Sequence, residues 1–184
     1  MAAVSRAFLS ELGQVLHEEH FRILSLICGL EYRVGGAEGR RPIDPRDADE
    51  KVHLQELIVA LDQIIDHNRF EEAVLFPLLC ARGGAELASL LTQEHDSIGP
   101  RARRVREIAG RILAHGIDAE RWAEFQDAAN ELAAEMMAHL QKEEMAVVQQ
   151  LRAFLDADTD HRLAVKHRLE RPPTRIKTAF QPAT

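Results

Sequence analysis

The sequence predicts an all-α protein that folds as an antiparallel up-down-up-down four-helix bundle. Three observations support this fold class. Apolar residues recur at spacings of three and four over four long segments, which is the period of one helix face. No segment shows a convincing strand pattern of alternating polar and apolar residues. The connections between the segments are mostly short, so consecutive helices are expected to run antiparallel.

The first two expected helices have clear start and stop signals. Apolar residues of the first helix recur over 8–34, and the glycine pair 35–36 then ends it. The second helix is expected to begin at Asp47 or Asp49, because an aspartate side chain can accept hydrogen bonds from the first backbone N–H groups. The glycine pair 83–84 ends this helix.

The third and fourth helices follow the same logic. Apolar residues recur over 87–113 and again over 122–154. Between them, the run HGID at 115–118 supplies a glycine stop and then an aspartate cap. Pro100 lies inside the third helix, where it predicts a bend, because proline lacks the backbone N–H of a regular helical hydrogen bond.

From about Asp158 the character of the sequence changes. The last residues are basic, contain three prolines and show no long apolar period. We therefore expect a bundle domain over 1–157 and a C-terminal tail over 158–184, which can begin with a short helix.

Composition excludes several classes of protein. The formal net charge of −7 argues against a general nucleic-acid binder, which would show a basic face. No apolar stretch is long enough to span a bilayer, and the N-terminus lacks the features of a secretory signal. Cys28 and Cys80 lie in apolar helical patterns, so we expect buried thiols in a reducing compartment. A cytoplasmic location follows by default.

Two motifs occur twice in the chain. The pattern L-x-x-E-H-x-x-I is found at 16–23 and again, 75 residues later, at 91–98. The pattern His-x-x-x-Glu-Glu is found at 67–72 and again, 72 residues later, at 139–144. The sequence therefore predicts a helix hairpin that is used twice.

The repeated motifs place polar residues on the helix faces that otherwise carry core residues. A buried carboxylate without a partner costs several kcal/mol, so an interior cluster of this kind needs compensation. Four imidazoles and two carboxylates suit a pair of first-row metal ions, with one bridging glutamate from each half and one histidine pair for each ion. The predicted metal ligands are His20, His67, Glu71, His95, His139 and Glu143.

Each of these residues, taken alone, also has a purely structural interpretation. A single histidine on an apolar helix face is more often a core residue with satisfied hydrogen bonds than a metal ligand, but a repeated set of six favours the metal. We expect other polar residues of the motifs to surround the site or to lie on the surface. The glutamates next to the motif residues are candidates for supporting contacts or for the helix surface: Glu19, Glu72, Glu94 and Glu144. The remaining histidines have no counterpart in the other half, and we expect them to be surface or structural residues: His17, His53, His115, His161 and His167.

These motifs resemble the hemerythrin-like family, the HHE cation-binding domains, over about residues 10–155. The run VLFP at 74–77 is also similar to the family. The resemblance implies a non-haem di-iron site in which the four motif histidines are iron ligands and Glu71 and Glu143 bridge the ions. Oxygen-carrying members have a further histidine where this chain has Gly99, so the resemblance implies six ligands rather than seven and an open metal position beside Gly99. Ferritin-like sites fit less well, because they are richer in carboxylates.

The leading functional hypothesis is a di-iron protein that binds or senses a small diatomic or peroxide ligand, such as O2 or NO. Two iron ions are expected, and zinc or another divalent metal can replace them in recombinant protein. One alternative is an enzyme that acts on peroxide or nitric oxide, or in iron handling or repair. Another is an iron-responsive module whose basic tail contacts a protein partner. We expect a monomer or homodimer that binds neither nucleic acid nor membrane.

Overall fold

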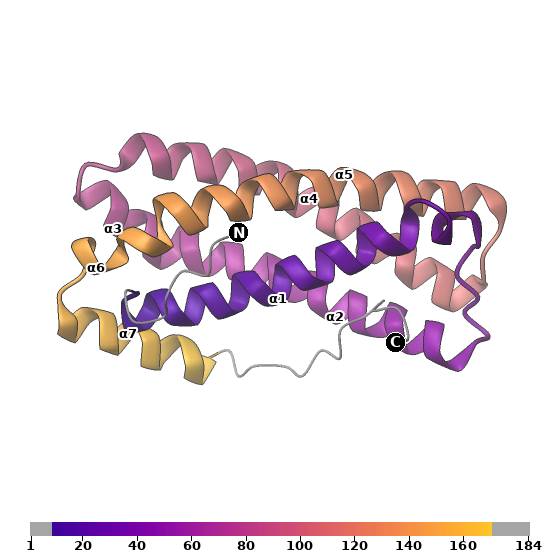
Figure 1. Ribbon diagram of the computed structural model, residues 1–184, viewed down its shortest axis with the longest axis horizontal. Coiled ribbons are helices and arrows are strands. Elements are labelled where there is room, and N and C mark those ends of the chain that lie inside the picture. Colours follow the sequence, from indigo (N-terminus) through magenta and orange to yellow (C-terminus); the bar gives the residue numbers. More distant parts are fainter. Residues whose placement is uncertain (1–8, 171–184) are drawn as a thin grey trace.

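The structure is a computed structural model that describes residues 9–170. Four long helices form an elongated antiparallel bundle (Figure 1). Helix α5 packs against α1 and α4, and α4 also packs against α2, which confirms the predicted fold class. The long helices are α1 (Glu11–Val34), α2 (Ala48–Phe70), α4 (Ala85–His115) and α5 (Ala119–Ala146). The shorter elements are η2 (Glu38–Arg40), η3 (Glu71–Leu75), α3 (Phe76–Ala81), η4 (Val148–Gln150), α6 (Leu151–Phe154) and α7 (Ala157–Glu170).

The predicted helix boundaries have the expected physical cause. The Asp47 carboxylate accepts hydrogen bonds from backbone N–H groups at the start of α2, and Asp118 does the same for α5. Gly116 ends α4 with a φ of 76°, a left-handed conformation that glycine adopts without steric cost. Helix α4 continues through Pro100 without ending there.

The apolar core is divided into two clusters along the bundle. One cluster extends to Trp122 and Phe125, and the other surrounds Leu12 and Leu79 at the opposite end. On α1, Leu16 belongs to the second cluster and Ile23 to the first, so the buried residue between them, His20, lies where the two clusters meet. A polar layer therefore interrupts the core partway along the bundle.

Helix α7 packs against α1 beside the bundle (Figure 1). Its buried Asp160 accepts hydrogen bonds from Ser10 Oγ at 2.7 Å and from the backbone N–H groups of Glu11 and Leu12 at 2.6 and 3.1 Å. Ordered packing thus continues past the boundary at 157–158 that the sequence suggested, because polar residues anchor this helix. The later part of the expected tail, 171–184, lies outside the described residues.

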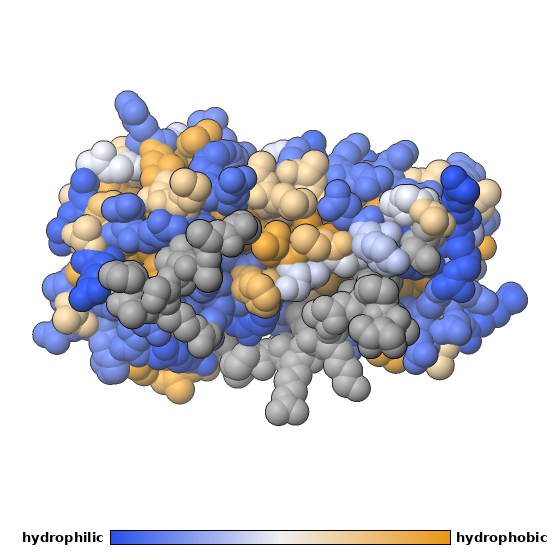
Figure 2. All heavy atoms as spheres, in the orientation of Figure 1, coloured by the Kyte–Doolittle hydropathy of each residue, from blue (hydrophilic) through white to orange (hydrophobic). Residues whose placement is uncertain are grey.

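On the face that Figure 2 shows, most of the described residues are hydrophilic, and apolar side chains lie among them. Cys28 and Cys80 are both exposed, so the expectation of buried thiols was wrong. Each cysteine follows a fully packed neighbour, Ile27 or Leu79, and one helical position is enough to turn a side chain out of the core. Within residues 9–170, no helix combines the length and apolar character that a membrane crossing requires.

Candidate metal centre

The chain changes its helical form where α2 reaches the polar layer. The π-helical turn η3 follows α2 directly, and the Phe76 N–H donates to the carbonyl of Glu71, five residues back. Pro77 explains part of this change, because it has no N–H to offer to the preceding turn. The change begins at Glu71, which is one of the predicted ligands. Turns of this kind are frequent at functional sites.

The structure brings all six predicted ligands together in the interior. None of the six is more than 4% exposed. Their ligand atoms form two overlapping groups, and within each group the atoms lie within 4.8 Å of one another. One group contains His20 and His67, the other contains His95 and His139, and both contain Glu71 and Glu143.

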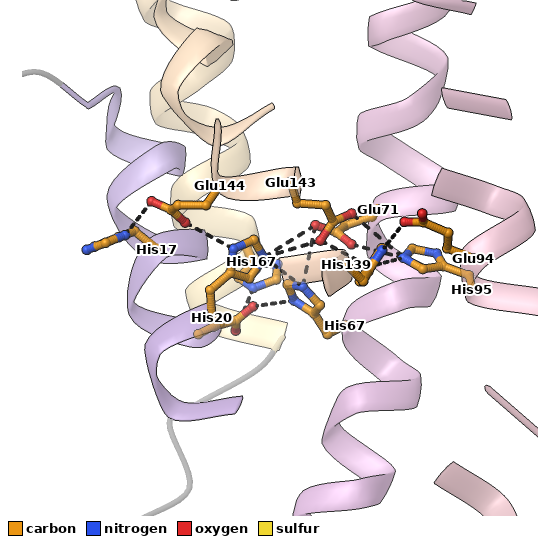
Figure 3. A network of polar contacts seen from close by, with 11 residues as sticks. His17, His20, His67, Glu71, Glu94, His95, His139, Glu143, Glu144 and His167 are labelled. Atoms are coloured by element: carbon orange, nitrogen blue, oxygen red, sulfur yellow. Dashed lines mark hydrogen bonds and ion pairs between the residues drawn. The ribbon is translucent and has the colours of Figure 1, made fainter. Parts of the chain in front are cut away.

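The two shared carboxylates face ring nitrogens of both histidine pairs (Figure 3). Glu71 has Oε1 at 3.4 Å from His67 Nε2 and Oε2 at 3.6 Å from His95 Nε2. Glu143 Oε2 lies 3.2 Å from His139 Nε2 and 3.6 Å from His20 Nε2. Each carboxylate can therefore serve both groups, which is the arrangement that a bridging ligand needs.

Each ligand histidine also contacts an outer glutamate through its other ring nitrogen. His20 Nδ1 lies 3.1 Å from Glu144, and His67 Nδ1 lies 3.0 Å from Glu19. The second half repeats the pattern at 2.9 Å in both cases, with His95 facing Glu72 and His139 facing Glu94. All four glutamates that the sequence placed beside the motifs thus make supporting contacts, and none is left only on the helix surface.

These outer contacts determine which face of each imidazole is free. An ionised carboxylate only accepts hydrogen bonds, so each Nδ1 carries the proton and donates it outward. In the neutral imidazole the inward Nε2 then offers a lone pair. His20 Nε2 lies 3.1 Å from His67 Nε2, and His95 Nε2 lies 3.0 Å from His139 Nε2. Two lone pairs that face each other at this distance require a proton or a metal cation between them.

The inner carboxylates also indicate that the centre needs a cation. Glu71 Oε2 and both carboxylate oxygens of Glu143 are buried without any hydrogen-bond partner. An uncompensated buried carboxylate costs several kcal/mol, and a coordinated cation removes that cost. The donor set therefore fits metal ions in both groups.

The pKa values show how the centre is balanced by protons alone. Burial would lower the pKa of His20, but the Glu144 and Glu71 carboxylates raise it to about 10. Burial would raise the pKa of Glu143, but the imidazoles of His139 and His95, which face its carboxylate at 3.2 and 3.7 Å, hold that pKa well below its usual range. Neutral histidines cannot offset the negative charge of the buried glutamates, so histidines of the cluster hold protons in the absence of metal. An entering metal ion would displace these protons.

Two histidines that the sequence left as surface or structural residues extend this network. His17 contacts Glu144 and also lines an open surface pocket of about 370 Å³ on α1. His167 of α7 is buried and donates through Nε2 to Glu19 Oε1 at 2.8 Å. His17 occupies a variable position of the first motif, and His167 lies outside both motifs. The only sequence signal for His17 was its position one helical turn before His20, and the sequence of α7 offered none for His167.

Gly99 does not lie where the sequence suggested. It is half-buried, and the nearest atoms to a Cβ built on it belong to the Arg103 guanidinium, the first at 3.5 Å. Ile98, which is 1% exposed, takes the inward position instead. The expectation that position 99 faces the centre was wrong, because the buried stripe of α4 runs from His95 through Ile98 to Ala102.

Fold and site together define a four-helix protein with a buried cation-binding cluster of histidine and glutamate. The family model described as the hemerythrin HHE cation binding domain matches residues 12–151. The chain belongs to this family. Comparisons with curated proteins and with solved structures found no match.

Proposed function

We propose that this protein is a non-haem di-iron protein that binds or senses a small ligand such as O2 or NO. The observation that carries the proposal is the overlap of the two groups, each with two histidines and the same two glutamates. In this arrangement one ion would be held at each histidine pair, and Glu71 and Glu143 would be shared by both ions.

The donor chemistry favours iron without excluding other metals. Imidazole suits iron, zinc, copper and nickel, and sites with two histidines and a carboxylate that keep open positions are typical of reactive ferrous iron. Neither group contains a cysteine thiolate, which would favour a structural zinc site. Zinc can occupy the same ligands when iron supply is low.

Each part of the protein has a distinct task in this proposal. Bound iron would supply the redox-active centre that binds or reacts with a diatomic or peroxide ligand. The four histidines and two glutamates hold it, and the outer glutamates keep each imidazole in the tautomer that points Nε2 inward. The two apolar clusters on either side of the centre keep bulk water away.

Spectroscopy of the iron-loaded protein tests the proposal. Anaerobically loaded protein is mixed with nitric oxide, O2 or peroxide, and absorption is followed in time, with Glu71→Gln as the control without an intact centre. A stable adduct supports binding or sensing, and repeated consumption of the ligand supports the enzymatic alternative. Metal-dependent capture of a protein without any ligand response supports the binding-module alternative. Failure to hold metal contradicts all three. A cytoplasmic location and a monomeric or dimeric state stay predictions.

A further inference from the structure

The two halves of the centre have equivalent ligands but different outer support. Glu19 precedes the first motif histidine and hydrogen-bonds His67 across the helix pair. Glu94 precedes the equivalent histidine of the second half and hydrogen-bonds His139 in the same way. These two glutamates are counterparts in the repeat, so their own second partners can be compared directly.

Those second partners come from different parts of the chain. The Lys142 ammonium donates to Glu94 Oε1. Lys142 stands three residues after His139, and the matching position after His67 is Phe70, which has no donor. In the first half the donor is His167, from a helix outside both repeats, and it lies 2.8 Å from Glu19.

Phe70 cannot donate a hydrogen bond as Lys142 does, but its ring contacts the donor His167. Its ring packs edge-on against His167, with ring centroids 4.2 Å apart and planes at 63°. Phe70, at the position that Lys142 holds in the other half, thus forms the surface against which His167 packs. Helix α7 supplies to the first half the hydrogen bond that Lys142 supplies to the second.

The two supports also differ in their exposure to water. The side chains of His167 and Glu19 are 1% and 16% exposed, whereas those of Lys142 and Glu94 are 36% and 25% exposed. Water and salt screen a buried hydrogen bond to a carboxylate much less than an exposed ion pair. The orientation of His67 is therefore fixed through a buried chain of contacts that leads from α7 through Glu19.

We propose that His167 is a positioning residue for the metal position of His20 and His67, so that metal retention at this position depends on the docking of α7. The metal position of His95 and His139 depends on Lys142 instead. By linkage, a metal ion at the first position also favours the docked state of α7. The inference rests on the proposed function in one respect, which is that the centre holds two ions.

Metal release from the full-length, two-metal protein tests the selectivity. Loaded protein is mixed with excess chelator, and the loss of each ion is timed. His167→Leu keeps an apolar side chain against Phe70 but removes the donor. Loss of a direct partner of a metal ligand weakens a site about 10–100-fold, and His167 acts one contact further out through Glu19. One ion should therefore leave faster by up to about tenfold, and the other should leave at the wild-type rate. His167→Gln restores a donor and should recover most of the retention.

Two controls assign the effect to one position. Lys142→Met is the matched variant in the second half and should speed release of the other ion. In a His67→Ala background, which lacks the first position, His167→Leu should change nothing further. Circular dichroism and thermal melts of each variant show that the bundle itself remains folded.

Hydrogen exchange gives a readout that does not depend on release rates. Removing metal from the wild-type protein should speed amide exchange in residues 157–170, and His167→Leu should abolish this response to metal. If His167→Leu releases both ions at the wild-type rates, or releases both faster by the same factor, the inference is overturned while the proposed function stands. A wild-type protein that holds no metal at the first position contradicts the proposed function and this inference together.

Discussion

Replacement of Glu71 by glutamine should weaken both metal positions at once. The Glu71 side chain is 1% exposed, and its two oxygens face His67 and His95, which belong to different groups. Glutamine has nearly the same volume, so the change removes one negative charge and its donor strength without opening a cavity. His67→Ala, in contrast, removes a ligand from one group alone.

The expected magnitude follows from the composition of the two groups. Each group has four residues, and Glu71 is one of the four in both. Loss of an outer partner costs up to about 100-fold in metal affinity, so loss of a direct ligand should cost at least that, or about 2.7 kcal/mol for each ion. Since both ions lose a ligand, the total binding free energy should fall by about 5 kcal/mol or more.

Competitive titration against a chelator of known affinity, with elemental analysis of the product, measures this effect. Glu71→Gln should show two weakened ions, and His67→Ala should keep one ion at nearly wild-type affinity. The control is His115→Ala, an exposed residue at the end of α4, which should leave both affinities unchanged. His17 is unsuitable as a control, because it contacts Glu144. If Glu71→Gln loses one ion alone, or neither, the carboxylate does not bridge.

Three further predictions concern protons, capping and a buried ion pair. Because the pKa of His20 is raised to about 10, metal binding must displace its proton at neutral pH, so affinity measured by calorimetry should fall about tenfold per pH unit for each proton released as pH is lowered. Asp160→Ala removes the acceptor at the start of α1 and should lower the free energy of unfolding by about 1–2 kcal/mol in urea titrations, with unchanged m-value. Arg33→Met leaves the buried Glu50 with Arg41 as its remaining cationic partner and should cost about 2–3 kcal/mol by the same assay, less than a fully unpaired buried charge. A loss below 0.5 kcal/mol in either variant would contradict its assignment.

The fold and the inner cluster could be predicted from the sequence, because both follow from the local periodicity of apolar residues. The repeated motifs place His20 and Glu143 on helix faces whose neighbours are apolar, and that placement alone predicts burial. The boundaries at Asp47 and Asp118 were equally local, because a helix cap involves only the next few backbone N–H groups.

Helical periodicity could not predict contacts between residues that are distant in the sequence. His167 and Glu19 are separated by 148 positions, and α7 has few buried side chains, so nothing in its sequence indicated that it packs on α1. The expectations for Cys28 and Gly99 were wrong for a different reason. Each lies one position from a buried residue, and a helical stripe read from sequence does not fix its edge to a single residue.

Anomalous X-ray diffraction at the iron absorption edge, on crystals of protein loaded anaerobically with iron, tests the central claim most directly. The account predicts two anomalous peaks per chain, one beside His20 and His67 and one beside His95 and His139, with both Glu71 and Glu143 between them. A single peak, or two peaks with either carboxylate turned away from one of them, would contradict the shared-carboxylate centre.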